Sequence, residues 1–479
     1  MSRQAATVRP GLIPEHAGVS RSQQERAFSK EPCRLTRPGV FLDEAAQGKQ
    51  SELLRADGFP GCGRLLGTPE VIAFAVCGDG MNAASELARK FQSRFGTHCE
   101  VYRAPGRVNL IGEHTDYNEG FVLPAAIEFS CWTAIQARED RKLVVYSENF
   151  DETAEAHLDT LPARGGGKWF DYPMGVARAL EREGKRLSGA NLYIRGEVPF
   201  GAGLSSSAAV EVCVGYALLN SAKLPFDLWE LARLSQRAEN EFVGARCGIM
   251  DQFISCFGRA GHALLLDCRS LVFEPVPIPR EVHLVICNTM VKHELSSGEY
   301  NVRREECEEA VRRLRGVMPE IRALRDATAG QLEQHRGRLG EKLYRRSLHV
   351  VTENDRARRA AAALKAGDLS AVGPLFAGSH RSLRDNYEVS CPELDLMVEL
   401  AEGLPGVRGA RMTGGGFGGC TINLVDAAHS HEFRSAIAEK YAAKTGLRPE
   451  VYICKAADGV GASAGNARES EVSAGASDA

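Results

Sequence analysis

Residues 106–117 carry four side chains that could do chemistry on a small molecule. Arg107 is a permanent cation, Glu113 and Asp116 are carboxylates, and His114 is an imidazole. Each carboxylate can accept hydrogen bonds from two adjacent hydroxyls, and the imidazole can donate or accept. The segment therefore suits a small, neutral ligand rich in hydroxyl groups. The same residue types also permit a metal site, which stays an alternative.

Residues 199–209 have the composition of an anion-binding loop, Pro-Phe-Gly-Ala-Gly-Leu-Ser-Ser-Ser-Ala-Ala. Glycines let backbone N–H groups converge on an anion, and the N-terminus of the following apolar helix favours negative charge. A serine that only caps the helix would explain a single Ser-Gly turn. Three serines favour a nucleotide phosphate, although the Gly-Lys-Ser/Thr ending of a Walker A loop is missing. The predicted nucleotide contacts here are Gly201, Ala202, Gly203, Leu204, Ser205, Ser206 and Ser207.

Two more carboxylates lie in the next part of the chain. Asp251 follows a glycine-containing turn within residues 247–253, and Glu239 lies twelve residues earlier in a helical pattern. On spacing alone, Asp251 would be a cap or turn residue and Glu239 a solvated helix residue.

A third glycine-rich segment, residues 411–420, offers a competing interpretation. Gly414, Gly416 and Gly419 fit Gly-x-Gly-x-x-Gly, the dinucleotide fingerprint. That fingerprint needs a helix directly after it, whereas residues 420–425 have the pattern of a strand. The pattern therefore argues against a nicotinamide dinucleotide site.

Taken together, these segments resemble the galactokinase family of the GHMP small-molecule kinases. Residues 106–117 resemble its signature, residues 199–209 its phosphate loop, residues 247–253 the loop of its catalytic aspartate, and residues 411–420 the third GHMP motif. The resemblance extends over residues 81–455. It implies an α+β, two-lobed GHMP kinase fold, with an N-terminal lobe of the ribosomal S5 domain 2-like type and a ferredoxin-like C-terminal lobe. It further implies phosphorylation of α-D-galactose at the C1 hydroxyl, with ATP and Mg²⁺.

The resemblance also implies a role for individual residues. Asp251 would be the base, and Arg107 would pair with it and stabilise developing negative charge. Ser207 and Glu239 would bind Mg²⁺. The implied sugar contacts are Glu113, His114, Thr115, Asp116, Gly248 and Tyr300, and the further nucleotide contacts are Ser147, Trp169 and Tyr172. For Trp169 and Tyr172, a place in the core is the alternative interpretation.

Hydrophobic periodicity predicts the elements that must position these residues. An amphipathic helix begins at Met81, and further helices are expected at 205–220, 228–242, 298–315, 341–365 and 392–403. Strands are expected at 100–104, 143–147, 192–194, 282–287, 407–412, 420–425 and 449–454.

The expected domain boundaries follow from shifts in composition. Residues 1–80 are predicted to be a poorly ordered extension, with Met81 as the true start and a regulatory arm as the alternative. Residues 81–278 and 279–455 are the two predicted lobes, joined near the prolines at 276–280. Residues 456–479 contain few large apolar side chains and are predicted to be a disordered tail.

The overall composition excludes several classes of partner. With 59 basic and 62 acidic side chains the net charge is −3, so no attraction to nucleic acid or membranes is expected. Fourteen cysteines occur without a Cys-x-x-Cys pair, which argues against a zinc site and fits a cytoplasmic protein. A monomer is expected, and a dimer stays open.

Two rival functions remain at this point. A sister kinase could act on N-acetylgalactosamine, arabinose or galacturonate, because sequence does not fix the contacts beside the sugar. A galactose sensor without turnover is the rival of another class. The intact serine run and Asp251 argue against it.

Overall fold

A computed structural model describes residues 80–292 and 296–462. The chain divides into two units, residues 1–73 and 74–479, and every described residue lies in the second. The extension predicted for residues 1–80 therefore lies outside the described residues, apart from Gly80, which begins helix α1 (Gly80–Phe95).

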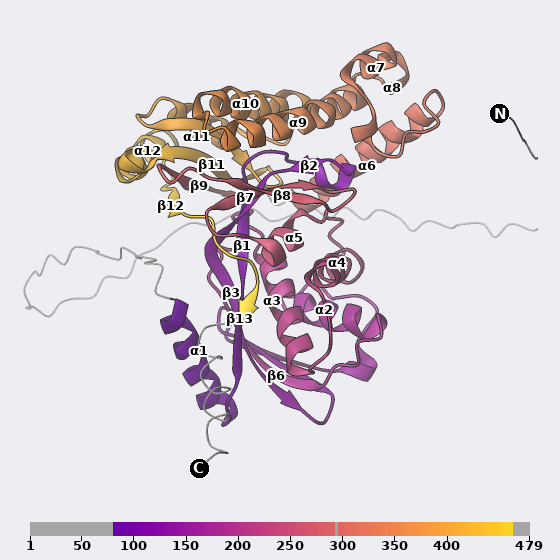
Figure 1. The fold of residues 1–479 in the computed structure, drawn as a ribbon, viewed down its shortest axis with the longest axis vertical. Coiled ribbons are helices and arrows are strands. Elements are labelled where there is room, and N and C mark those ends of the chain that lie inside the picture. The colour runs from indigo at the N-terminus through magenta and orange to yellow at the C-terminus, as the bar shows by residue number, and fades with distance from the viewer. Residues whose placement is uncertain (1–79, 293–295, 463–479) are drawn as a thin grey trace, which may run out of the picture. The chain divides into compact units, whose positions relative to one another are not determined.

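The N-terminal half is built on a mixed sheet (Figure 1). Its strand order is β13-β1-β3-β6-β4-β5. Its strands are β1 (Glu100–Asn109), β3 (Pro124–Arg138), β4 (Lys142–Ser147), β5 (Glu152–His157), β6 (Gly189–Gly196) and β13 (Gly461–Ala462). Neighbouring pairs are antiparallel except β4 and β6, which are parallel. Successive residues face opposite sides of the sheet. Val101 and Tyr193 accordingly pack with α1, whereas Tyr102 and Leu192 belong to the main core.

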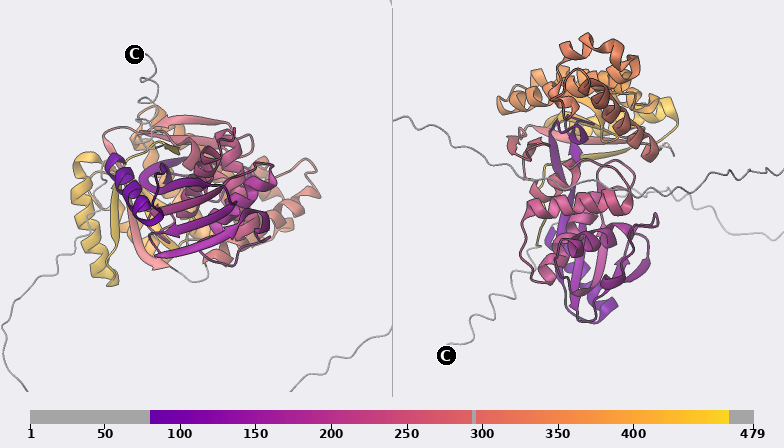
Figure 2. Two further views of the ribbon diagram at one scale, coloured as in Figure 1. Left: turned by 90° about the horizontal axis from the view of Figure 1, so that it is seen from below. Right: turned by 90° about the vertical axis from the view of Figure 1, so that its right-hand side faces the viewer.

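Helices cover the other face of this sheet and carry several site residues (Figures 1 and 2). They are α2 (Asp171–Arg182), α3 (Ser206–Ser221), α4 (Leu228–Ala238) and α5 (Met250–Phe257). The helix predicted at 228–242 ends as α4 at Ala238 and continues as a π-helical turn, η3 (Glu239–Val243). Such turns are frequent at functional sites. Short 3-10 turns are η1 (Asp116–Asn118) and η2 (Leu158–Thr160).

A small antiparallel sheet, β2-β7-β8, follows on the chain, with β2 (Phe121–Val122), β7 (His262–Asp267) and β8 (Phe273–Pro277). The C-terminal half has an antiparallel sheet of order β10-β11-β9-β12, formed by β9 (Val282–Lys292), β10 (Val407–Thr413), β11 (Gly418–Asp426) and β12 (Glu450–Cys454). Alternate residues of β9 again face opposite sides. Val285 and Cys287 pack with helices α11 (Pro392–Glu402) and α12 (Ser430–Thr445), whereas Leu284 and Ile286 join the main core.

The remaining helices lie between β9 and α11 in the chain (Figure 1). They are α6 (Ser296–Arg315), α7 (Ala329–Gln334), α8 (Arg336–Leu339), α9 (Glu341–Lys365) and α10 (Leu369–Ser382), with the turns η4 (Leu324–Asp326) and η5 (Leu383–Tyr387). The turn η6 (Ala427–His429) precedes α12. Within the described ranges, no helix combines the length and apolar character that crossing a bilayer requires.

The predicted α+β class is confirmed, and one boundary needs correction. The tail was expected from residue 456, but Ala456 bridges to Ile127 and Gly461 pairs with Arg103 as part of β13. Backbone pairing to the first sheet orders this stretch although it lacks large apolar side chains. The rest of the expected tail, residues 463–479, lies outside the described residues. The lobe boundary near 278 stays a prediction. The chain changes sheets there, since β8 ends at Pro277 and β9 begins at Val282.

Candidate active site

Arg107 is the centre of the site. It lies on β1, where the pairing with β3 shifts register, and it is 5% exposed. Its guanidinium donates two hydrogen bonds of 2.8 Å to the two carboxylate oxygens of Asp251. A further bond of 2.5 Å goes to the carbonyl of Gly203 in the phosphate loop. Two parallel bonds fix both position and orientation of the pair. The predicted pairing of Arg107 with Asp251 is confirmed.

Asp251 also contacts the serine run. It lies in the first turn of α5, and the hydroxyl of Ser205 donates to its Oδ2 at 2.5 Å. Ser205 immediately precedes α3 with a φ of +59°, and its side chain makes no capping bond to that helix. The serine therefore links the phosphate loop to Asp251.

Asp116 and Gly248, two of the predicted sugar contacts, lie against each other. A Cβ added at Gly248 would lie 1.9 Å from Asp116 Oδ2 and 2.2 Å from its Cγ, so a side chain at this position would force Asp116 or the backbone to move. Burial and the nearby charge of Asp251 raise the pKa of Asp116 to about 6. The structure thus brings residues 106–117, 199–209 and 247–253 together at the carboxylates of Asp116 and Asp251.

His114 and Tyr300 lie together near Asp116 and Asp251. The His114 ring is 5.6 Å from the Tyr300 ring of α6 and 4.7 Å from the Tyr387 ring of η5. Burial is the main cause that lowers the pKa of His114 to about 3, so its ring is neutral near pH 7. His114 has a φ of +61°, a backbone conformation that non-glycine residues rarely adopt. Tyr117 packs edge-on against Tyr300 at 5.4 Å.

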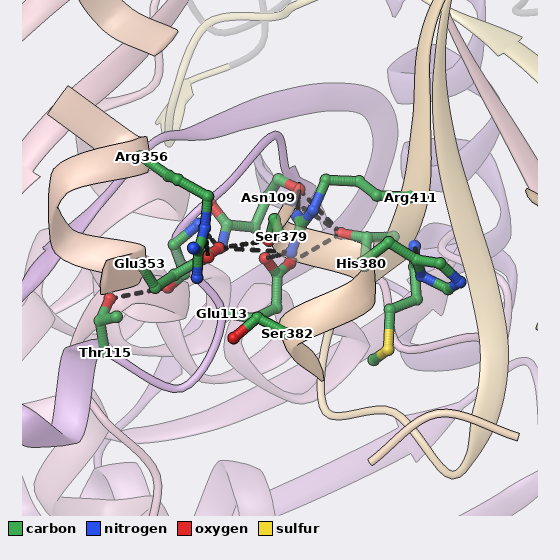
Figure 3. Close-up of polar contacts among 12 residues, drawn as sticks. Asn109, Glu113, Thr115, Glu353, Arg356, Ser379, His380, Ser382 and Arg411 are labelled. Carbon is green, nitrogen blue, oxygen red and sulfur yellow. Dashed lines mark hydrogen bonds and ion pairs between the residues drawn. The ribbon is translucent and has the colours of Figure 1, made fainter. Parts of the chain in front are cut away.

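Glu113 is held by the C-terminal half of the protein (Figure 3). Its carboxylate pairs with Arg411 on β10 and accepts a 3.1 Å bond from the Gly414 amide. Arg411 is also 3.6 Å from Glu353 on α9, and all three charged side chains are buried. Burial alone would raise the pKa of Glu353, but Arg356 and further cations lower it to about 2. Arg411 and Gly414 already engage the carboxylate oxygens of Glu113. A role for Glu113 in sugar binding stays a prediction.

The hydroxyl of Thr115 is used inside the signature loop. It contacts the carbonyls of Gly112 at 2.7 Å and Phe121 at 2.8 Å, and the residue is fully buried. A hydroxyl has one proton to donate, and these carbonyls take it. Thr115 therefore holds the loop through its hydroxyl, and its predicted contact with the sugar stays a prediction.

The phosphate loop and the third motif meet. Gly201 and Gly203 have φ values of +71° and +74°, which side chains rarely adopt, while Ala202 and Leu204 anchor the loop in the core. A Cβ on Gly414 would be 3.0 Å from the Gly203 carbonyl. The third motif connects β10 to β11, and its last glycines already belong to β11. A strand therefore follows where the dinucleotide fingerprint needs a helix, so that interpretation is wrong.

Ser207 and Glu239 provide the oxygen donors that Mg²⁺ prefers. Glu239 is buried at the start of η3, and burial together with Asp251 raises its pKa, while a hydrogen bond with Ser207 lowers it. Gln252 donates to Glu239 at 2.5 Å and to Glu211 at 3.0 Å. A buried carboxylate fixed by an amide, with a serine hydroxyl beside it, fits a small divalent cation.

A cavity of about 630 Å³ lies at the N-terminus of α3. Ser147, Trp169, Tyr172, Ser206 and Ser207 are among the residues that line it, so Trp169 and Tyr172 face a cavity rather than only the core. The first N–H groups of α3 have no acceptor within the helix and favour an anion there.

Sequence reasoning missed several residues of the site. Phe150 stacks on Trp169 with ring centres 5.9 Å apart, and Phe150 and Phe200 are more than half exposed at the same cavity. Arg411 was overlooked as a functional residue although it begins the third glycine-rich motif. Glu353 carries no local signal, because it is one of many charged residues in a long helical pattern.

The geometry agrees with comparisons to known proteins. Residues 89–137 match the galactokinase galactose-binding signature, residues 171–259 the N-terminal domain of GHMP kinases, and residues 360–443 their C-terminal domain. A galactokinase of Roseiflexus sp. strain RS-1 is 48% identical over 387 residues, which cover 81% of this chain and 99% of that protein. A galactokinase of Haemophilus influenzae is 44% identical, over 74% of this chain and 93% of its own length.

Solved structures give the same result. The crystal structure of Lactococcus lactis galactokinase complexed with galactose superposes with a TM-score of 0.77 at 39% identity, covering 79% of this chain and 99% of that one. The mevalonate kinase of Methanococcus jannaschii has a TM-score of 0.55 at 17% identity, over 76% of this chain and all of that one. The second likeness shows the shared fold alone. The expected GHMP kinase fold is confirmed, and the chain belongs to the galactokinase family.

Proposed function

We propose that this protein transfers the γ-phosphoryl group of ATP to the C1 hydroxyl of α-D-galactose, in galactose metabolism. The observation that carries the proposal is the paired Arg107 and Asp251, which lies between Asp116 and the N-terminus of α3. A carboxylate for the acceptor and a helix N-terminus for the phosphates are thus next to each other. Phosphoryl transfer needs mainly such positioning and charge stabilisation.

Asp251 is the residue that accepts the proton of the attacking hydroxyl. Its two oxygens are fixed by Arg107, and one also receives the Ser205 hydroxyl, so its orientation is set before the sugar arrives. Arg107 stabilises negative charge as it develops on the transferring group. Asp116 and His114 bind sugar hydroxyls, and the tight contact at Gly248 keeps Asp116 in place.

The nucleotide occupies the cavity beside α3, with its base near Trp169 and Tyr172 and its phosphates at Ser205 to Ser207. Ser207 and Glu239 would hold Mg²⁺, which would neutralise phosphate charge. Gln252 fixes the Glu239 carboxylate for that task. A cytoplasmic location and a monomeric state stay predictions.

The proposal is tested by ADP release from ATP and Mg²⁺ with galactose, N-acetylgalactosamine, arabinose, galacturonate, glucose and mevalonate as acceptors. Turnover on galactose well above the others is the expected result. Strong turnover on another sugar would keep the chemistry and replace the substrate. Binding of galactose without turnover on any acceptor would overturn the proposal in favour of a sensor.

A further inference from the structure

A chain of hydroxyl and thiol groups leads from His114 into the helices of the C-terminal half. His114 Nδ1 is 2.7 Å from the Tyr117 hydroxyl, which is 2.8 Å from the Tyr387 hydroxyl. Cys307 Sγ follows at 3.1 Å from Tyr387. His114, Tyr387 and Cys307 are buried, and the His349 ring packs against Tyr387 at 4.6 Å.

The other ring nitrogen of His114 is differently placed. Its Nε2 is buried and has no hydrogen-bond partner among the residues that the structure describes. Leaving a buried polar atom without a partner costs free energy, so such an atom at a ligand site is poised for a ligand. Because the ring is neutral, one nitrogen carries the proton and the other accepts. The partner of Nδ1 therefore decides what Nε2 offers.

The hydrogen-bonding strengths of the groups set the direction of the chain. A thiol is a weak acceptor, so the chain is better satisfied when Cys307 donates to Tyr387, Tyr387 to Tyr117, and Tyr117 to Nδ1. In the opposite direction, the Tyr387 hydroxyl would donate to the sulfur of Cys307, a weak acceptor. With Tyr117 donating to Nδ1, the proton of the neutral ring lies on Nε2.

We propose that Tyr387 is a positioning residue of the sugar site: through Tyr117 it holds His114 in the Nε2–H form, so that Nε2 donates a hydrogen bond to an oxygen of the sugar. This inference rests on the proposed role of His114 in sugar binding. It adds that the C-terminal half, through η5, fixes which sugar oxygen pattern the N-terminal signature accepts.

Tyr387→Phe removes one oxygen and leaves the ring in place. We expect the galactose KM to rise about 5- to 20-fold, the size of one lost hydrogen bond of about 1–2 kcal/mol, with kcat and the ATP KM within about twofold. Tyr441→Phe is the matched control. Tyr441 is equally buried, and its hydroxyl donates to the Thr289 carbonyl at 3.1 Å. The galactose KM of the Tyr441→Phe variant should not change.

Two readouts separate positioning from a general structural effect. Nitrogen NMR of the His114 ring should show Nε2–H in the parent protein and a shift toward the Nδ1–H form in Tyr387→Phe. Tyr117→Phe should raise the galactose KM as Tyr387→Phe does, and the double variant should be no worse than Tyr117→Phe alone. If Tyr387→Phe does not fold, the Tyr117→Phe variant carries the same test.

An Nδ1–H form in the parent protein, or equal behaviour of Tyr387→Phe and Tyr441→Phe, would overturn the inference. His114→Ala distinguishes the two levels of failure. If His114→Ala leaves the galactose KM unchanged, the proposed sugar role of His114 is wrong. If it raises the KM while Tyr387→Phe does not, only the positioning role of Tyr387 is wrong.

Discussion

Gly248→Ala tests the sugar site through a single added methyl group. The new Cβ would lie 1.9 Å from Asp116 Oδ2 and 2.2 Å from its Cγ, whereas real Cβ atoms do not approach other heavy atoms within 3.0 Å. The carboxylate or the 247–250 turn must therefore move by about 1 Å. A displacement of that size at a reacting site can cost about 10²-fold, or roughly 2.7 kcal/mol.

We expect the galactose kcat/KM of this variant to fall about 10- to 100-fold, mostly through KM. The ATP KM should stay within about twofold, because Gly248 does not line the nucleotide cavity. Overpacking should also lower the free energy of unfolding by about 1–3 kcal/mol. The assay is ADP release with each substrate varied at saturating concentration of the other, together with a urea unfolding curve.

Gly330→Ala is the matched control, since Gly330 lies in helix α7 and an added Cβ meets nothing within 4 Å. It should leave both KM values unchanged and stabilise the protein slightly, by up to about 1 kcal/mol. A Gly248→Ala enzyme with the parental galactose KM would show that Asp116 does not bind the sugar in the position described.

Three further predictions concern the buried ion network, pH and the nucleotide cavity. Arg411→Met leaves Glu113 and Glu353 buried without their shared cation and should cost about 3–5 kcal/mol, seen as a Tm at least about 5 °C lower, whereas the exposed Arg408→Met should change Tm little; equal Tm values would refute the network's role. The galactose KM should rise as pH falls through about 6, because the raised pKa means that Asp116 becomes protonated there, and it should be flat above pH 7; a KM that is independent of pH from 5.5 to 7.5 would contradict this. Trp169→Ala should raise the ATP KM about tenfold and spare the galactose KM, because base stacking is worth about 1–3 kcal/mol, and a change confined to galactose would refute it.

The raised pKa of Asp116 also makes the stability of the folded protein depend on pH. Its folded pKa lies above the ordinary value of 3.8, so the folded protein binds this proton more tightly than the unfolded chain. The ionised carboxylate therefore costs stability above about pH 6, and the cost is relieved as pH falls from 6 toward 4. The penalty arises because Asp116, the proposed acceptor for sugar hydroxyls, is desolvated in the folded protein.

Most of the elements that carry the site could be predicted from the sequence, because periodicity and local motifs coincide there. The strand at 100–104, the helix at 205–220 and the strand at 420–425 appear as β1, α3 and β11. Helix α10 was missed, because Gly373, Pro374 and Gly378 interrupt its pattern. Tertiary packing explains the glycine at position 373, because a Cβ there would lie 2.7 Å from the Arg408 carbonyl of β10.

The site was predictable where one segment contains the residues and the resemblance gives their roles. The pairing of Arg107 with Asp251 spans 144 residues and came from the resemblance, not from spacing. The long-range partners Glu353 and Tyr387 could not be found, because nothing in a helix sequence says which buried charge or hydroxyl it will meet. The same limit applies to Thr115, whose type permits ligand binding but whose neighbours take its proton.

The most direct test of the central claim separates sugar binding from turnover in Asp251→Asn. The variant keeps the shape of the side chain and removes the base, so calorimetry should give a galactose Kd within a few-fold of the parent protein. Formation of galactose 1-phosphate should fall by about 10²- to 10⁴-fold, the range of a general base. A melting curve confirms that the variant is folded, since Arg107 loses a charged partner. Undiminished product formation by the folded variant would contradict the assignment of Asp251 as the base.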